Sequence, residues 1–252
     1  MNHYPPDEPE QSGRPARVAL AGAFRLAARF GWNEAVANHF SLALPGGDFL
    51  INPQGRHWAR MQASDIVRLD PRNPEAAIGN GPGKVDPTAW HIHATIHARV
   101  PGAGCVLHTH MPWATALCCL RGFRLQMCEQ NAMRFHERIA WDEDFAGMAL
   151  DVAEGERLAA AMGEKPILFL VNHGVIVTAP SLARAFDEMY YLERACQTQV
   201  LALSTGRELA VVDDAVARLT CQQWMEYPAE AFEDHFRELM ALLDEQEPAH
   251  AG

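Results

Sequence analysis

The chain has 252 residues, of which 48% are hydrophobic, and a formal net charge of -11. A chain of this length can bury a large core without dividing into two domains. The negative charge and the presence of only two lysines, Lys84 and Lys165, argue against a nucleic-acid partner, which needs clustered basic side chains. Because no apolar run has the length of a membrane span and the polar start is unlike a signal peptide, we expect a cytoplasmic protein with no membrane partner.

The first third of the sequence predicts an extension, a helix and a hairpin. Residues 1–14 are rich in Pro, Glu and Gln without periodicity, which predicts disorder. A helix is expected over 15–30, ended by Gly31. Strands are expected over 40–44 and 49–52, joined by the turn residues at 45–48. The Pro- and Gly-rich stretch 70–84 predicts a long loop, and long loops in compact domains are often functional.

The central part predicts a capped helix followed by a buried strand. Asp86 is expected to cap a helix that has Pro87 at its first position. On that helix Ala89, His93 and His97 follow one another at intervals of four and form one stripe. The apolar run 104–107 then leads into a strand, and a helix is expected over 112–120.

The last part predicts helices around one strand pair. Helices are expected over 151–162, from Ser181 to Gly206, and as two short segments within 213–243, and the strand pair covers 167–178. The irregular alternation indicates a layered α/β domain with a mixed sheet. The six cysteines show no C-x-x-C pairing, so we expect buried thiols rather than disulfides.

Three histidines predict a metal site. His108 and His110 are two apart at the end of a strand and therefore point to the same face. His173 lies in a Gly-containing turn between two apolar runs, from which it could reach across a sheet. Three neutral imidazoles suffice to hold a catalytic divalent cation with one open position. A lone His-x-His is weak evidence, since core histidines are often satisfied by backbone groups.

Several ordered motifs resemble those of the class II aldolase/adducin family. They run from about residue 15 to 205 and comprise residues 38–41, 52–55, 63–70, 101–110, 171–175 and 191–196. The resemblance implies a three-layer α/β/α fold with a central mixed, largely antiparallel sheet, over a domain of residues 15–210 with a helical extension at 211–252. It also implies a homotetramer with sites between subunits and a divalent metal, zinc first and manganese or iron as alternatives. The substrate-binding residues that it implies are Asn38, Ser41, Asn52, Gly55 and Thr88.

The chain departs from the sugar-phosphate aldolases of this family at two places. Pro87-Thr88-Ala89 stands where those aldolases carry Ser-Ser-Glu, so the Glu that moves protons is replaced by Ala89. The phosphate-binding turn is Asn52-Pro53-Gln54-Gly55 instead of Thr-Pro-Ser-Gly. The resemblance is therefore to the adducin-like branch, and we expect a small, non-phosphorylated oxo or hydroxy acid as substrate.

Another group must move protons if Ala89 cannot, unless the reaction needs no base. Decarboxylation needs only a proton donor after the bond has broken. We expect His93, Glu129 and Tyr191 as catalytic residues, His93 first because it shares a stripe with Ala89; His39 and His97 are further candidates. Each of these side chains could instead be an ordinary core or surface residue.

Three functions remain open at this point. The first is a metal-dependent lyase that breaks a C–C bond through a metal-stabilised enolate. For this lyase, decarboxylation is favoured and aldol cleavage is the next choice. The second is a non-haem Fe(II) oxygenase that uses the same three histidines. The third is a non-catalytic, adducin-like interaction module, which the retention of His108, His110 and His173 argues against.

Overall fold

A computed structural model describes residues 13–73, 75, 77–79, 83–145 and 147–252. One seven-stranded sheet crosses it in the order β3-β2-β1-β4-β7-β6-β5. Only β5 and β6 pair in parallel, so the described sheet is mixed and largely antiparallel, as expected. The strands are β1 (His39–Ala43), β2 (Phe49–Ile51), β3 (Val67–Leu69), β4 (Cys105–Thr109), β5 (Ile139–Asp142), β6 (Ile167–Leu170) and β7 (Gly174–Ala179).

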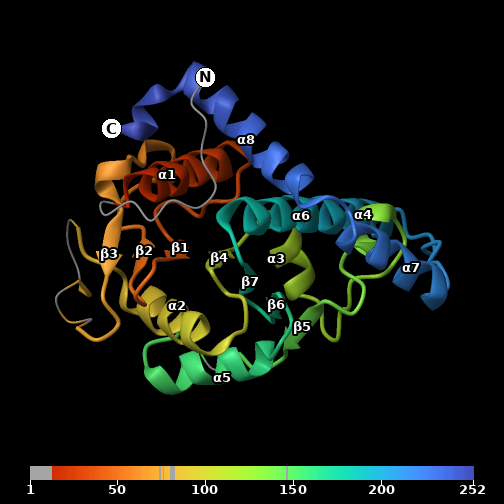
Figure 1. The fold of residues 1–252 in the computed structure, drawn as a ribbon. Coiled ribbons are helices and arrows are strands. Elements are labelled where there is room, and N and C mark those ends of the chain that lie inside the picture. The colour runs from red at the N-terminus through yellow and green to blue at the C-terminus, as the bar shows by residue number, and fades with distance from the viewer. Residues whose placement is uncertain (1–12, 74, 76, 80–82, 146) are drawn as a thin grey trace.

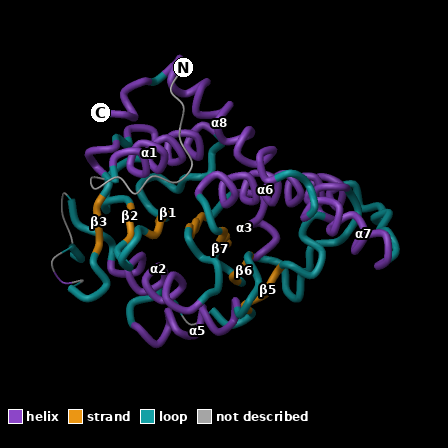
Figure 2. Tube along the Cα trace, viewed as in Figure 1, coloured by secondary structure: helices purple, strands orange, loops and turns teal. Residues whose placement is uncertain are grey.

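Helices cover both faces of the sheet and complete three layers (Figures 1 and 2). On one face lie α1 (Arg14–Arg29), α3 (Pro112–Cys118), α6 (Leu182–Ser204) and α8 (Ala229–Gln246). On the other lie α2 (Pro87–Arg99) and α5 (Val152–Met162). The short α4 (Gln130–Met133) and α7 (Asp214–Met225) lie beside the end of α6. The three-layer α/β/α prediction is thus confirmed.

The helix starts follow from side chains that satisfy free backbone N–H groups. The Asp86 carboxylate accepts a hydrogen bond from the N–H of Thr88 at the start of α2. Asp151 caps α5 and Ser181 caps α6 in the same way. These three starts agree with the sequence-based prediction. The elements that were predicted differ from the observed ones by a few residues at their ends, where hydrogen bonding frays. The sequence analysis did not predict β3, β5 or α4.

The pleat of β4 decides which side chains reach the site. Cys105 and Leu107 pack into the core under α1 and α6, whereas Val106 packs into the core under α2 and α5. Successive side chains on a strand alternate between faces. His108 therefore shares the α2 face with Val106, and it lies opposite His39 of β1 in the antiparallel register.

The C-terminal helices belong to the same body of structure. Phe236, Met240 and Leu243 of α8 are buried in the core under α1 and α6. The expected disorder of residues 1–14 falls almost wholly outside the described residues; Gly13 precedes α1, which begins at Arg14. Much of the expected loop at 70–84 is described, with gaps at 74, 76 and 80–82.

All six cysteines are free thiols, and four of them are buried, as expected. Burial raises the pKa of the Cys105 thiol above the range in which it would ionise. Among the helices of the described chain, none has both the length and the apolar character needed to cross a membrane.

Candidate metal centre

The structure brings His108, His110 and His173 together. One ring nitrogen from each lies within 4.8 Å of the other two. His108 and His110 come from the end of β4, and His173 comes from the turn between β6 and β7. That turn lies against β4 because β7 pairs with β4 up to Thr109 and Val175. The predicted cluster of three imidazoles therefore forms within one chain.

Hydrogen bonds aim the ε nitrogens of two histidines into the cluster. His108 Nδ1 donates to the carbonyl oxygen of Val175 at 3.0 Å. His110 Nδ1 lies against the Glu34 carboxylate, and its Nε2 is buried without a hydrogen-bond partner in the described chain. A histidine ligand commonly donates its other N–H to a carbonyl or carboxylate, which orients the ring and fixes the tautomer. The residues present thus fit a divalent cation held by nitrogen.

Burial favours the neutral, ligating form of these rings. It lowers the pKa of His173 to about 4 and holds that of His108 well below its usual value. The neighbouring imidazoles add to both effects because protonating one ring disfavours charge on the next. His108 and His173 can therefore each offer a lone pair to a metal near neutral pH without first losing a proton.

The backbone of the β6–β7 turn is shaped to present His173. Asn172 adopts a left-handed conformation with φ of 56°, which asparagine tolerates better than most residues. Gly174 follows, and a Cβ at this position would lie 2.5 Å from the Thr109 carbonyl oxygen and 2.8 Å from His110 Cδ2. A glycine is therefore required for the turn to approach β4 this closely.

A chain of hydrogen bonds runs beneath the cluster from Ala103 to His39. His97 Nδ1 lies 2.7 Å from the Ala103 carbonyl oxygen, and Ser41 Oγ lies 2.7 Å from His97 Nε2. Ser41 Oγ is also 2.5 Å from His93 Nδ1, and His93 Nε2 is 3.1 Å from His39 Nδ1. Ser41 and His93 are fully buried.

The carbonyl at one end sets the direction of every bond in this chain. A carbonyl oxygen only accepts, so His97 Nδ1 donates to it and His97 Nε2 must accept from the Ser41 hydroxyl. His93 Nδ1 then donates to Ser41 Oγ, and His39 Nδ1 donates to His93 Nε2. Burial lowers the pKa of His93 and His97, so both rings are neutral, as this scheme requires. The lone pair of His39 is thereby left on Nε2.

A cavity of about 610 Å³ opens over the three histidines. His39, Asn38, Asn52, Thr88 and Ala89 line it as well. The His39 ring stacks on that of His108, with centroids 5.1 Å apart. Ala89 thus lies in the same cavity as the histidines, at the place where the family resemblance expects a proton-transferring Glu.

The charges around the cavity are unlike those of a phosphate site. Among its described lining residues the charged ones are Glu34 and Asp86, and neither Lys nor Arg is present. The start of α2, where free N–H groups could bind a phosphate, is occupied by the Asp86 carboxylate. Gln54 Nε2 also donates to Asp86, at 3.0 Å.

The structure does not place all the predicted site residues together. Ser41 lies under the cavity with its hydroxyl bonded to two histidines, and Gly55 is exposed and outside the cavity lining. Glu129 caps α4, where its carboxylate accepts from the N–H groups of Asn131 and Ala132. Tyr191 lines a different cavity between α6, α7 and α8. Within one chain, neither Glu129 nor Tyr191 meets the histidines.

The sequence analysis missed Glu34 and the linkage between Ser41 and the α2 histidines. Glu34 is 76 residues from His110, and nothing in its local pattern marks it as a partner. The stripe of His93 and His97 was visible in the sequence. Its pairing with Ser41 depends on how closely α2 packs on β1, which only the folded chain shows.

Comparisons with known proteins agree with this fold and identify the family. Residues 18–200 match the Class II Aldolase and Adducin N-terminal domain. A putative aldolase class 2 protein of Caulobacter vibrioides is 35% identical over 77% of this chain and 74% of its own length. Human beta-adducin is 28% identical over 75% of this chain, but only 26% of its own length is covered.

Solved structures show the same architecture. The crystal structure of an aldolase II superfamily protein from Pseudomonas syringae has a TM-score of 0.87 with 30% identity, covering 96% of this chain and 97% of the other. An L-fuculose 1-phosphate aldolase from Glaciozyma antarctica shares the fold, with a TM-score of 0.81, 23% identity and 96% of both chains covered. The chain belongs to the class II aldolase/adducin family, and it carries the three-histidine group that suits the metal of such aldolases.

Proposed function

We propose that the protein is a divalent-metal-dependent lyase that breaks a C–C bond in a small, non-phosphorylated oxo or hydroxy acid. Decarboxylation is favoured over aldol cleavage. The observation that carries the proposal is the set of three converging imidazoles at the wall of an open cavity. A scaffold for protein contacts has no need of such a group, which argues for chemistry over a purely adducin-like role.

His108, His110 and His173 hold the metal, and Glu34 and the Val175 carbonyl keep two of the rings oriented. When bound, a divalent cation supplies the charge that stabilises the electron pair left on the substrate as the C–C bond breaks. We propose zinc, with manganese and iron as alternatives, and neutral imidazoles suit zinc and iron best.

The described cavity wall contains neither Lys nor Arg, so the substrate's carboxylate depends on the metal for its positive partner. His39 Nε2 accepts a hydrogen bond from a substrate hydroxyl, since the buried chain of bonds leaves its lone pair there. His93 touches both Ser41 and His39 and is a positioning residue that acts through His39. Asn38 and Thr88 line the same cavity and complete the substrate contacts.

Decarboxylation is favoured because Ala89 offers no base and loss of CO2 requires none, and the enolate that remains takes its proton from water in the open cavity. Aldol cleavage, by contrast, requires a group to take the hydroxyl proton. Of the described histidines that line this cavity outside the metal cluster, His39 offers a free lone pair for this purpose. A homotetramer, as in the family, would supply further side chains such as Tyr191 or Glu129 from a neighbouring subunit. Sedimentation of the purified protein tests the assembly.

The first test is metal content after anaerobic purification, combined with CO2 and aldehyde release over a panel of oxo and hydroxy acids. His173→Ala should cut bound metal sharply, whereas His57→Ala, at an exposed histidine away from the cavity, should retain it. Full metal in His173→Ala would remove the proposed site. Bound iron with substrate-dependent oxygen uptake would instead establish an oxygenase.

The second test separates the two lyase reactions. His39→Phe keeps a ring against His108 but removes the acceptor, so it should abolish aldol cleavage and leave decarboxylation measurable. Equal loss of both activities with metal content unchanged would contradict the favoured reaction.

A further inference from the structure

A second cavity has a volume of about 470 Å³. Its walls come from α4, α6, α7 and α8, and it shares no described lining residue with the first cavity. Four aromatic side chains line it: Tyr191, Trp224, Tyr227 and Phe232. Its size is that of ordinary small-molecule sites, which are about 300 to 1,000 Å³.

Arg134 is one of the residues that line this cavity. Arg134 is 0% exposed, and its Cζ lies 4.8 Å from the ring centroid of Tyr191, 5.4 Å from that of Trp224 and 5.1 Å from that of Phe232. Three rings therefore enclose a buried cation on the side of the cavity. A cation held there needs a full set of partners.

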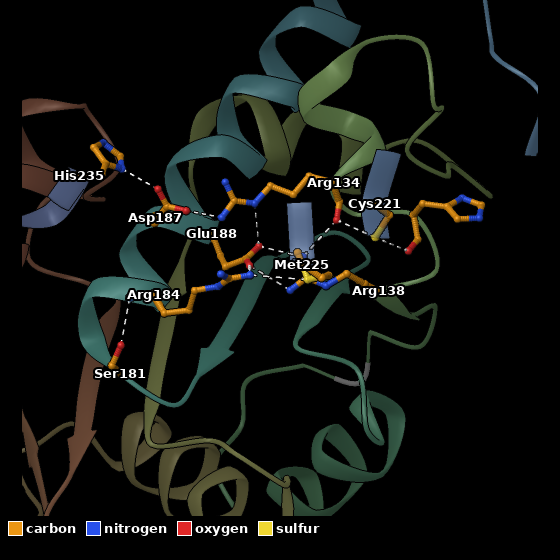
Figure 3. Close-up of polar contacts among 10 residues, drawn as sticks. Arg134, Arg138, Ser181, Arg184, Asp187, Glu188, Cys221, Met225 and His235 are labelled. Carbon is orange, nitrogen blue, oxygen red and sulfur yellow. Dashed lines mark hydrogen bonds and ion pairs between the residues drawn. The ribbon is translucent and has the colours of Figure 1, made fainter. Parts of the chain in front are cut away.

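The Arg134 guanidinium lacks part of its full set of hydrogen-bond partners. One of its terminal nitrogens pairs with Asp187, and its Nε lies 3.5 Å from Glu188 Oε2. Its other terminal nitrogen, Nη1, is buried and has no hydrogen-bond partner among the described residues. Figure 3 shows this nitrogen outside every drawn contact, pointing away from both carboxylates.

The charges of the surrounding network do not balance. Arg138 and Arg184 also pair with Glu188, at 3.0 and 2.7 Å, so three guanidinium groups share the carboxylates of Asp187 and Glu188 (Figure 3). One positive charge in this network is left without a carboxylate. His235 does not offset it, because its Nδ1 donates to Asp187 at 2.7 Å.

From this geometry we infer that the second cavity binds a small carboxylic acid with a flat, apolar or aromatic body. The carboxylate would accept from Arg134 Nη1, and the body would stack on Trp224 and Tyr227. One unbalanced charge matches a monoanion better than a doubly charged phosphate ester. The rings account for an apolar body, because an aromatic wall offers stacking area and few hydrogen bonds.

The test titrates the purified full-length protein with benzoate, using calorimetry or ligand-observed NMR. Benzamide and phenyl phosphate serve as neutral and doubly charged probes of similar shape. Benzoate should bind at least tenfold more tightly than either. Equal affinity for benzamide, or no binding of benzoate, would overturn the inference, and tighter binding of phenyl phosphate would overturn the choice of a monoanion.

Three variants locate the binding. Ala231→Trp fills the cavity while leaving the Arg134 side chain in the protein and should abolish benzoate binding. Ala229→Trp, two residues earlier on α8 and outside the cavity lining, should leave binding intact. His173→Ala removes a proposed metal ligand and should also leave it intact. Benzoate binding that persists in Ala231→Trp, or is lost in His173→Ala, would place the probe elsewhere. Arg134→Met should weaken benzoate binding at least tenfold if this variant folds. If it does not fold, the comparison of Ala231→Trp with Ala229→Trp tests whether benzoate binds in this cavity.

The cavity could instead receive a second copy of the chain. In that case Ala231→Trp would change the oligomeric state in sedimentation while benzoate failed to bind the parent protein. That combination would refute the carboxylate site.

Discussion

Ser41→Ala tests the chain of hydrogen bonds beneath the metal centre. The Ser41 hydroxyl is fully buried and serves two imidazoles, as donor to His97 Nε2 and as acceptor from His93 Nδ1. Removing one oxygen leaves both nitrogens without a partner in a place that water does not reach. The substitution barely changes volume, so the effect of polarity dominates over that of a cavity.

The magnitude follows from those two nitrogens. Each buried polar group left unsatisfied costs about 1 to 3 kcal/mol. The two rings can turn slightly toward each other and recover part of the loss, so we expect a destabilisation of about 3 kcal/mol. For a chain of this length, this corresponds to a fall in Tm of roughly 6 to 12 °C.

Urea denaturation of the wild type and Ser41→Ala, followed by tryptophan fluorescence, measures the change. Thr109→Val is the matched control on the neighbouring strand. Thr109 Oγ1 is equally buried but has no hydrogen-bond partner in the described structure, so replacing it with a methyl group should be neutral or stabilise by about 1 kcal/mol.

A second measurement examines the tautomers directly. Nitrogen-15 NMR of the imidazoles should show His39 protonated at Nδ1 in the wild type, and a mixture of both tautomers in Ser41→Ala. Ser41→Ala within about 0.5 kcal/mol of the wild type, or an unchanged His39 tautomer, would refute the assigned direction of the bonds.

Three further predictions concern the acid on α6, the glycines and Ala89. Burial raises the pKa of Glu193 from 4.5 to about 7, although the N–H groups of Trp113 and Ala114 oppose it. The contribution of this group to the free energy of unfolding is therefore full below pH 4.5 and is lost as the pH rises through 7, by up to about 3 kcal/mol. Glu193→Gln should reduce the change of the urea midpoint with pH between pH 5 and 8, and an unchanged slope would contradict this. Gly174→Ala should weaken metal binding, because the added Cβ would displace His110. In the control Gly155→Ala, the added Cβ would meet the His91 carbonyl, so stability should fall by about 1 to 3 kcal/mol while metal affinity is retained. Equal metal affinity in the two variants would argue against the close approach of the turn to β4. Ala89→Glu should reduce decarboxylation, because a carboxylate in the cavity competes for the metal and repels an acidic substrate. CO2 release and aldehyde release measure the two lyase activities. A gain in both would contradict our interpretation of Ala89 in place of the family Glu.

Local patterns were enough to predict most of the elements. Asp86, Asp151 and Ser181 mark helix starts through hydrogen bonds to N–H groups two or three residues away, so the signal lies within a few positions of sequence. The strand that ends in His108 and His110 is identified by its apolar run and its period of two. The family motifs predicted the rest of the architecture, including the three layers.

The site could be predicted only in part, because the residues that contact one another in it are far apart in sequence. The sequence by itself determined which histidines share a face, since two residues on a strand or four on a helix set that geometry. Only the tertiary structure decided that Glu34 contacts His110, that Ser41 bonds to the α2 histidines and that Arg134 lines a second cavity. The reason is physical: these contacts depend on the distance and angle between packed elements, and no short-range pattern encodes either.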